Sequence, residues 1–388
     1  MPRFPDTAQS AQGLSPKVFS RLAAKAQDRP DRIYPLHVGD TWMEPLEAAR
    51  AESQRTAEHP RLHNYAPVHG EPALLEAIEA HLERRGDCLV DRDNLQVTSG
   101  ATAGLSVVAE ALFDPGDEVL LPAPYWPLIR GIIAKRGATP VEVPFFDRVW
   151  DEGFEAEAAL EAAVTERTVA VYVNTPHNPT GTVLPDDVVA AIGRVAERHD
   201  LWIVSDEVYE DLYFGGLPPE PVWARADYQR RCVAAHSVSK AYGLAGARVG
   251  WVHGPHEAMA TIRGVQTFST YCAPRPMQLG AARALNEGEA WLADARRSYR
   301  DAAARTASAL GLREPQGGTF VFFDVSHRIG DDETVIDVLE RCLDAGVLLT
   351  PGAASGRDYA RWVRLCFTSV PPDALSEALD RIAPLVGC

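Results

Sequence analysis

The sequence predicts an α/β protein: a large domain with a mostly parallel sheet, covered on both faces by helices, plus a smaller α+β domain. From about residue 70 to residue 275, short continuous apolar runs alternate with segments of helical periodicity. Such runs are typical of parallel strands that are buried on both faces. Beyond about residue 280, helical segments dominate at first and fewer strand-like segments follow. The length of 388 residues also favours two domains.

The elements of the large unit follow one another in a regular order. An amphipathic helix over residues 71–86 is closed by Gly86, because glycine ends helices without steric cost. The Pro115-Gly116 turn leads into the second strand. We predict strands at residues 94–100, 116–124, 138–145, 168–176, 201–209, 231–240 and 247–254. Helices are expected between them at residues 101–113, 127–137, 154–164 and 185–200.

The smaller unit is expected to contain strands over residues 318–325, 346–352 and 362–369, with helices between and after them. We predict an N-terminal arm over residues 1–35. A small domain is predicted from residues 36–50 together with 280–388, and the large domain from residues 51–279.

Charge and composition exclude several classes of protein. Lys and Arg number 38 against 54 Asp and Glu, which gives a formal net charge of −16. A chain of this charge repels a phosphate backbone, so we expect no nucleic acid partner. The first residues lack the apolar core of a secretory signal, and no run of 18 apolar residues occurs, so we expect no membrane association. The six cysteines form no CxxC pair, which is typical of free thiols in the cytoplasm.

Polar or aromatic residues stand at or just after the ends of five predicted strands. They are Gly100 to Thr102, Tyr125, Asn178, the pair Asp206 and Tyr209, and Ser237 to Lys240. In open α/β sheets, ligands bind beyond the carboxyl ends of the strands. We therefore expect these side chains to converge on one crevice.

The segment SVSKAYGLAGARVG, residues 237–250, carries the strongest chemical signal. It fits the pattern SxSKxxGLxGxRxG at all eight specified positions. A chance match somewhere in the chain has a probability on the order of 10⁻⁷ at average residue usage. The segment resembles the lysine motif of fold-type-I pyridoxal-phosphate enzymes of the class I/II aminotransferase family.

Further motifs of this family occur in the expected order. They are NYxxxxG (64–70), the GAT turn (100–102), PxPYW (122–126), NPTG (178–181), DExY (206–209) and VRLCF (363–367). The resemblance covers the chain from about residue 30. It implies the PLP-dependent transferase fold, pyridoxal 5'-phosphate as cofactor, and a homodimer. It also implies transfer of an amino group from an α-amino acid to a 2-oxo acid through a lysine Schiff base.

The resemblance assigns the two central roles to Lys240 and Asp206. The cofactor acts as an electron sink, and a lysine must hold it covalently and move protons. Lys240 in the motif matches that lysine, and burial with nearby positive charge would lower its pKa. Asp206 matches the buried carboxylate that keeps the cofactor's ring nitrogen protonated. Its neighbour Glu207 is expected to face solvent.

The other cofactor contacts are also implied by the resemblance. Asn178 and Tyr209 are expected to hydrogen-bond to the phenolic oxygen of the cofactor. Tyr125 is expected to stack on its ring, with Trp126 as the alternative if the register is shifted by one. The phosphate is expected to be bound by Gly100, Ala101, Thr102, Ser237, Ser239 and Arg248. Tyr65 is implied to reach this phosphate from the partner subunit.

The substrate is expected to contact Gly39, Asn178 and Arg364, with Arg364 binding the α-carboxylate. The sequence departs from the family in one loop, which reads PGAASG with Ser355 at the usual aromatic position. Neither Arg263 nor Arg275 convincingly matches the arginine that binds distal carboxylates in aspartate-specific members. A dicarboxylic amino donor is therefore in doubt, while 2-oxoglutarate stays open as acceptor.

Three rival functions are weighed against an aminotransferase. A lyase, cyclase or synthase of the same fold would use the same core residues. A regulator that uses the fold as a ligand sensor carries a basic DNA-binding domain in front, which does not suit this acidic chain. A nicotinamide dehydrogenase requires a GxGxxG loop that the sequence lacks. No metal site is expected, and the acidic segment EVYED (207–211) is expected to be a strand end with surface residues.

Overall fold

The structure of the protein is a computed structural model. The residues that it describes are 8, 11–12, 14, 22–27, 33–86 and 90–387. Most of the predicted N-terminal arm, Cys88 and Cys388 therefore lie outside them.

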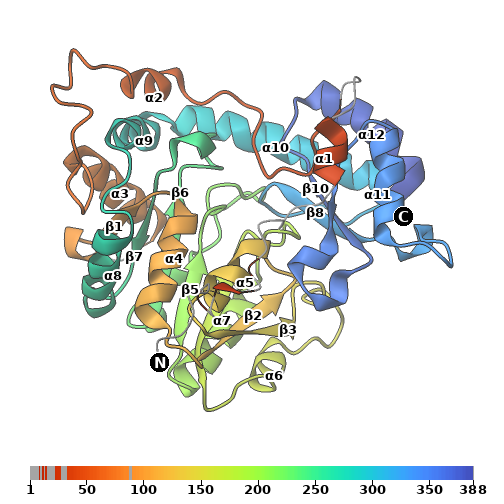
Figure 1. The fold of residues 1–388 in the computed structure, drawn as a ribbon, viewed down its shortest axis with the longest axis horizontal. Helices are drawn as coiled ribbons and strands as arrows, with labels where there is room; N and C mark the ends of the chain where they lie inside the picture. The colour runs from red at the N-terminus through yellow and green to blue at the C-terminus, as the bar shows by residue number, and fades with distance from the viewer. Residues whose placement is uncertain are drawn as a thin grey trace, which may run out of the picture.

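A seven-stranded sheet forms the centre of the larger unit (Figure 1). Its strands are β1 (Leu95–Thr98), β2 (Glu118–Ala123), β3 (Thr139–Pro144), β4 (Thr168–Asn174), β5 (Trp202–Asp206), β6 (Cys232–Ser237) and β7 (Gly250–His253). Their spatial order is β1-β7-β6-β5-β4-β2-β3. Neighbours from β6 to β3 pair in parallel, and only β7 runs antiparallel to the strands beside it. The predicted, mostly parallel sheet is confirmed.

Helices cover this sheet, and further helices belong to the smaller unit. They are α1 (Leu22–Gln27), α2 (Glu47–Glu52), α3 (Pro72–Arg85), α4 (Ala101–Leu112), α5 (Pro127–Ala134), α6 (Ala156–Glu161), α7 (Asp186–Arg198), α8 (His256–Ser269), α9 (Arg275–Glu287), α10 (Glu289–Leu310), α11 (Val335–Asp344) and α12 (Pro372–Val386). The helix that was expected to close at Gly86 is α3, which ends at Arg85.

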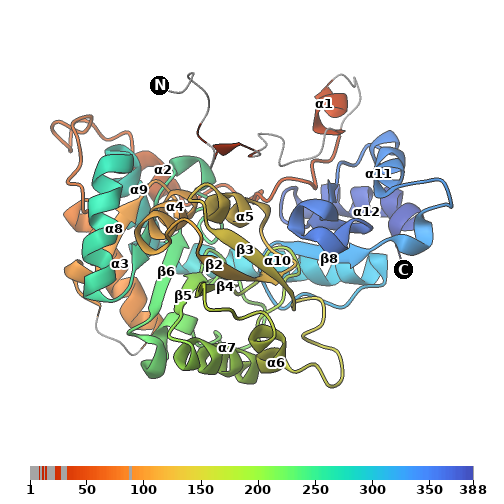
Figure 2. The ribbon, with the colours of Figure 1, turned by 60° about the horizontal axis from the view of Figure 1, so that its bottom comes forward.

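Two apolar layers hold these helices against the sheet. Helices α4, α5 and α8 contribute Leu105, Ile129 and Met259 to the core on one face. Helices α3, α6 and α7 contribute residues such as Ile78 and Leu160 to the core on the other face. Figure 2 shows α4 and α5 on one side of the strands, and α6 and α7 on the opposite side. Coverage of both faces explains why the strands are continuously apolar in sequence.

The smaller unit is built on a three-stranded antiparallel sheet with the order β8-β10-β9. Its strands are β8 (Phe320–Asp324), β9 (Thr350–Pro351) and β10 (Trp362–Cys366). The segment before α2 runs beside this sheet, because Cys366 N–H donates to Leu36 O at 2.8 Å and Trp42 N–H donates to Thr368 O at 2.8 Å. This pairing brings Gly39 next to β10, which is far away in sequence.

The proposed limits of the arm and of the two domains stay a prediction. Gly280, the predicted start of the second part of the small domain, lies inside α9, which packs against α2 and α3. Among the described residues, no helix is long and apolar enough to cross a membrane. Four cysteines of the described part, Cys232, Cys272, Cys342 and Cys366, are free thiols.

Candidate active site

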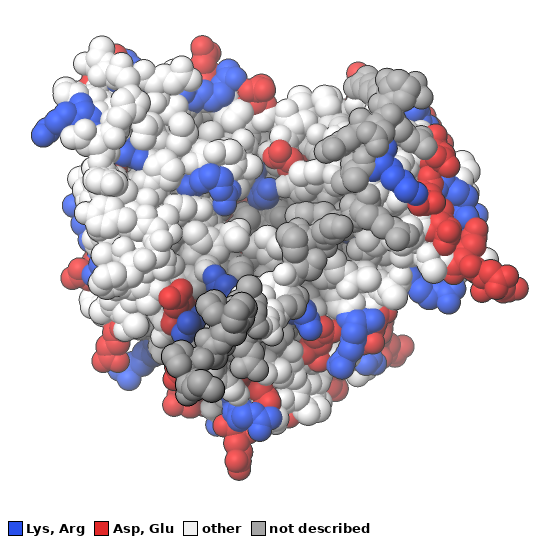
Figure 3. Space-filling model, viewed as in Figure 1, with Lys and Arg blue, Asp and Glu red and all other residues white. Residues whose placement is uncertain are grey.

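A pocket of about 150 Å³ lies at the carboxyl ends of the central strands. It is lined by Ala101, Thr102, Leu105, Trp126, Asn174, Asn178, Asp206, Val208, Tyr209, Ser237, Ser239, Lys240 and Arg248. The structure thus brings together nine of the residues that the sequence singled out for the cofactor. On the face drawn in Figure 3, several Lys and Arg side chains lie around the hollow near the middle, and most Asp and Glu lie toward the edge.

Asp206 forms the buried acidic end of this pocket. It is the last residue of β5 and only 4% exposed. Tyr172 Oη donates to its Oδ2 at 2.6 Å, and Val208 N–H donates to its Oδ1 at 3.3 Å. Burial raises the pKa of Asp206 to about 6, although the hydrogen bond from Tyr172 opposes this shift. Among the described residues no Lys or Arg pairs with this carboxylate. A buried acid that is paired with no Lys or Arg side chain is suited to a protonated ring nitrogen.

Lys240 approaches the pocket from the loop after β6. Its Nζ donates a short hydrogen bond to Gly39 O, so the ammonium lies beside the loop that precedes α2. Burial lowers the pKa of Lys240, and the opposing effect of the Asp40 carboxylate is smaller. A lowered pKa increases the fraction of neutral amine, which is the form that attacks a carbonyl carbon.

Arg364 lies on β10 and is fixed from two sides. Its Nη1 donates to Asn178 Oδ1 at 3.1 Å, and its Nη2 donates to His37 O at 3.2 Å. The guanidinium carbon is 4.3 Å from the centroid of the Phe320 ring. Arg364 is 4% exposed, and no hydrogen-bond partner is found for its Nε in the part of the chain that the structure describes. The guanidinium therefore keeps free donor capacity for an anionic group.

Asn178 connects this arginine to Tyr209. Asn178 Nδ2 donates to Tyr209 Oη at 3.4 Å, and burial raises the pKa of the Tyr209 phenol. The backbone of Asn178 is held in turn by Asn174, whose Oδ1 accepts from Asn178 N–H at 2.8 Å. Asn174 Nδ2 donates to the carbonyl of Asp206 at 2.7 Å. Asn174 thereby ties the loop after β4 to the end of β5.

An anion cradle forms where α4 begins beside the lysine loop. Gly100 precedes α4 with φ = 80°, and an added Cβ would lie 2.5 Å from Arg248 Nη2. Arg248 itself has φ = 53°, and its Nη1 donates to Ala245 O at 2.9 Å. Ser237 Oγ donates to Ser239 Oγ at 2.7 Å. The free N–H groups of the helix start, these hydroxyls and the guanidinium form a binding site suited to a phosphate.

The structure corrects the expectation for Tyr125. Its hydroxyl donates to Glu142 Oε1 at 2.7 Å, and its backbone N–H donates to Ser355 O at 3.0 Å. The Tyr125 side chain is 1% exposed and is not among the pocket-lining residues, whereas Trp126 is. The cause is tertiary: Glu142 of β3 and Ser355 hold Tyr125 away from the pocket, and Trp126 lines the pocket instead.

Tyr65 lies outside the pocket of its own chain. Its side chain is 83% exposed, and its ring centroid is 5.3 Å from that of Tyr271. Phe268, near the end of α8, is 93% exposed. The aromatic residues Tyr65, Phe268 and Tyr271 thus expose apolar surface in one region of the fold. Such a group is unusual on a surface that contacts only water.

The structure also corrects the expectation that the acidic segment after β5 lies at the surface. Glu207, expected to face solvent, is 2% exposed, and Glu210 and Asp211 are 5% and 6% exposed. Burial, and after it the neighbouring Glu210 carboxylate, raise the pKa of Glu207. Ser205 Oγ donates to Glu207 Oε1 at 2.7 Å. Packing of this segment against α3 covers it, which the local sequence does not reveal.

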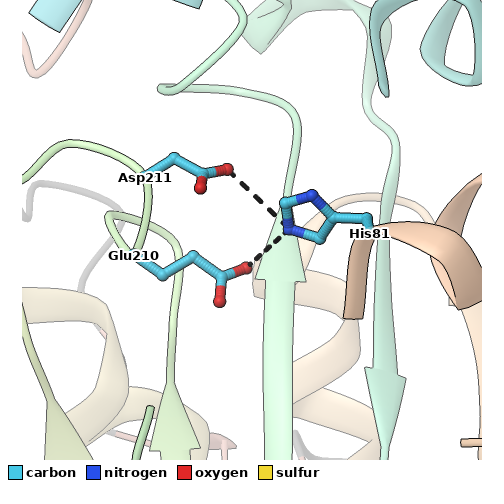
Figure 4. Close-up of side chains that lie close together, drawn as sticks. All are labelled: His81, Glu210 and Asp211. Carbon is cyan, nitrogen blue, oxygen red and sulfur yellow. Dashed lines mark hydrogen bonds and ion pairs between the residues drawn. The ribbon is translucent and has the colours of Figure 1, made fainter. Parts of the chain in front are cut away.

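Figure 4 shows Glu210 and Asp211 of this segment beside His81 of α3. His81 Nε2 is 3.4 Å from Glu210 Oε1 and 3.8 Å from Asp211 Oδ2. Arg85 Nε lies 3.9 Å from Glu210 Oε2 and 3.8 Å from Asp211 Oδ1. Burial alone would lower the pKa of His81, but Asp211 and Glu210 raise it. Because Arg85 and His81 already balance the two carboxylates, this group is an ion-pair network and carries no metal assignment.

Sequence reasoning missed Tyr172, Asn174, Leu105, Val208 and His37. Asn174 carried a usable signal, since it is a polar residue at the end of an apolar strand. Tyr172 gave no such signal, because a tyrosine inside an apolar strand is usually plain core.

Comparison with known families agrees with this geometry. The profile of the family Aminotransferase class I and II matches residues 32–382. The chain belongs to the class I and II aminotransferases. It is accordingly a pyridoxal-phosphate-dependent aminotransferase of amino acids.

Several aminotransferases are similar to it over most of their length. An aspartate/prephenate aminotransferase of Thermus thermophilus is 33% identical, and the match covers 94% of this chain and 91% of that protein. An arginine–pyruvate transaminase of Pseudomonas aeruginosa is 34% identical, with coverage of 82% and 81%. The solved N-succinyldiaminopimelate aminotransferase of Mycobacterium tuberculosis superposes with a TM-score of 0.89 at 28% identity, covering 98% of this chain and 100% of that one.

Proposed function

We propose that this aminotransferase places its cofactor between Asp206 and the anion cradle, with Lys240 as the covalent and proton-transferring residue. The observation that carries the proposal is the buried Asp206 carboxylate, which pairs with no Lys or Arg side chain in the described part of the chain. When bound, pyridoxal phosphate supplies an electron sink for the electrons of the substrate α-carbon. The residues present fit this group at its ring nitrogen, its phosphate and its aldehyde.

Each residue then has a defined task. Lys240 Nζ holds the cofactor and later takes the proton from the substrate α-carbon. Asn178 and Tyr209 donate hydrogen bonds to the phenolic oxygen. Trp126, rather than Tyr125, covers the ring face. The phosphate is bound by Gly100, Ala101, Thr102, Ser237, Ser239 and Arg248, at the start of α4 and in the lysine loop. Gly39 and its loop border the amino end of the substrate.

We propose that Arg364 binds the substrate α-carboxylate and that the amino donor lacks a distal carboxylate. Arg275 is held by Glu71 Oε1 at 2.7 Å, and Arg263 Nη2 donates to Asp93 O at 3.0 Å, so neither faces the pocket. The experiment is a half-reaction, in which an amino acid converts the aldehyde form of the bound cofactor to the amine form. Neutral amino acids are expected to convert it, and aspartate at least about tenfold more slowly. A faster reaction with aspartate would exclude this specificity.

Replacement of Arg364 by lysine tests the carboxylate assignment. Loss of a paired guanidinium contact costs roughly 1.5–3 kcal/mol, so we expect KM for the amino donor to rise about 10- to 100-fold. Arg361→Lys is the matched control, because Arg361 lies just before the same strand and its side chain donates a 3.4 Å hydrogen bond to Ser326 O. Equal KM values for the two variants would remove Arg364 from the substrate site.

We also propose a homodimer in which the partner's Tyr65 reaches the phosphate. The support is the exposed aromatic surface of Tyr65, Phe268 and Tyr271, which lies outside the pocket of its own chain. A second copy of the chain would cover this surface. A cytoplasmic location is proposed from the free thiols of the described part.

The variant Phe268→Asp is expected to dissociate the dimer, because it places a charge in an apolar contact. Sedimentation velocity measures the mass of the species, and the wild-type enzyme should sediment as two chains. Leu217→Asp is the control, since Leu217 is 84% exposed and lies in the loop between β5 and β6, not on α8. A Phe268→Asp enzyme that keeps the mass of two chains would refute this interface.

A further inference from the structure

Tyr172 makes a short, buried contact with the carboxylate that the proposed function assigns to the cofactor. Tyr172 belongs to β4 and is 3% exposed. Its hydroxyl donates to Asp206 Oδ2 at 2.6 Å from the neighbouring strand, with Asn174 paired opposite Asp206 in the parallel ladder. Hydrogen bonds to a charged oxygen are the stronger ones in proteins, and this length is typical of them.

The two carboxylate oxygens of Asp206 have different hydrogen-bond partners. Oδ2 accepts from the phenol, while Oδ1 accepts only the backbone N–H of Val208, at 3.3 Å, among the residues that the structure describes. A carboxylate can accept more donors than these. Asp206 therefore keeps acceptor capacity that faces the pocket, while Tyr172 restricts rotation of the carboxylate about its last bond.

We propose that Tyr172 is a positioning residue that fixes Asp206, and through it the protonation of the cofactor's ring nitrogen. The inference rests on the proposed function of Asp206 and goes beyond it, because Tyr172 does not itself line the pocket. Its phenol acts only through the carboxylate.

The alternative is that Tyr172 is ordinary core. It packs in the same apolar cluster as Val204 and Ala235, and a phenylalanine would fill that space equally well. The hydroxyl distinguishes the two interpretations. Burying a hydroxyl without a partner is costly, and Asp206 supplies the partner that the described structure shows.

The other ionisable groups near Asp206 do not replace this contact. His236 on β6 stabilises the carboxylate through its charge, and the nearby groups of Tyr209 and Glu207 interact with it electrostatically. No hydrogen bond joins any of these three side chains to Asp206 in the described structure. Tyr172 is therefore the side chain that holds the carboxylate directly.

Tyr172→Phe in the holoenzyme tests the proposal. The visible absorption of the bound cofactor is measured as a function of pH. The absorption changes when the nitrogen that joins the cofactor to Lys240 loses its proton. A ring nitrogen that is less firmly protonated withdraws less electron density from the nitrogen that joins the cofactor to Lys240. The pKa of that joining nitrogen should therefore rise by about one unit. The dissociation constant of the cofactor should rise about tenfold and kcat should fall at least about tenfold, while KM for the donor changes less than about threefold.

Tyr228→Phe is the matched control. Tyr228 is also a buried tyrosine, and its hydroxyl donates to Val189 O at 3.3 Å, in the core on the opposite face of the sheet. That variant should leave the absorption titration and the cofactor affinity unchanged. An unchanged titration in Tyr172→Phe would overturn the proposal.

Two further variants keep the test decisive. If Asp206→Asn shifts the titration and Tyr172→Phe does not, only the role of Tyr172 fails. If Asp206→Asn leaves it unchanged, the proposed function of Asp206 fails as well. Should Tyr172→Phe not fold, difluorotyrosine introduced at position 172 makes the phenol a stronger donor and should lower the pKa of the transition. No change with difluorotyrosine would also overturn the proposal.

Discussion

The variant Lys240→Ala is expected to fold, to bind no cofactor covalently, and to lose turnover by at least about 10⁴-fold. One substitution removes both the amine that holds the cofactor and the base at the substrate α-carbon, and general base catalysis alone contributes about 10²–10⁴-fold. The fold should persist, because Lys240 is only half-buried and its side-chain hydrogen bond is to the carbonyl of Gly39.

Borohydride reduction followed by peptide mass analysis measures the covalent attachment. The wild-type enzyme should carry the cofactor on the peptide that contains Lys240, and Lys240→Ala should carry none. Lys135→Ala is the control, since Lys135 also hydrogen-bonds within the fold, to Ser106, but at the end of α5 and away from the pocket. Attachment that persists in Lys240→Ala would contradict the assignment.

The variant Asp206→Asn is expected to lower turnover of the holoenzyme about 100-fold or more and to stabilise the cofactor-free protein. Turnover falls because the neutral amide does not keep the ring nitrogen protonated. Stability rises because the cofactor-free protein no longer buries an ionised carboxylate that pairs with no Lys or Arg side chain.

The sign of the pH dependence follows from the pKa of Asp206, which burial raises to about 6 in the folded protein. An unfolded aspartate has a pKa of about 3.9. Between these values the folded state binds more protons, so ionisation of Asp206 makes unfolding easier as pH rises from about 4 to about 6. The stability advantage of Asp206→Asn should therefore grow by about 2 kcal/mol between about pH 4.5 and pH 8.

Urea unfolding of the two cofactor-free proteins at these pH values measures this difference. Asp200→Asn is the control, because the Asp200 side chain is 97% exposed and it has a backbone conformation that asparagine tolerates. A constant difference between Asp206→Asn and wild type across this range would show that Asp206 has an ordinary pKa.

The two central groups have complementary surroundings. Lys240 is on the pocket wall nearer the substrate loop, where burial favours the neutral amine. Asp206 is at the buried strand end, where Tyr172 and Val208 hold a carboxylate in place. Burial thus lowers the pKa of Lys240 and raises the pKa of Asp206, and perturbed pKa values of this kind are typical of catalytic sites.

Sequence alone determined the strands, their parallel pairing and the residues that gather at their carboxyl ends. Continuous apolar runs, turn residues and the lysine motif are local signals, because periodicity and backbone chemistry depend on neighbours in the chain. The resemblance of the lysine motif and of the other motifs to the class I/II aminotransferases then predicts Lys240, Asn178, Asp206 and Arg248 as site residues, and all four line the pocket.

Tertiary structure alone decided which side chains face the pocket and which are covered. The choice between Tyr125 and Trp126 depends on a turn that Glu142 and Ser355 hold from other strands and loops. Burial of Glu210 depends on His81, 129 residues away, and the contact of Tyr172 with Asp206 joins two strands. Such contacts between distant segments leave no period in the sequence, because their energy depends on packing that forms only when the whole chain has folded.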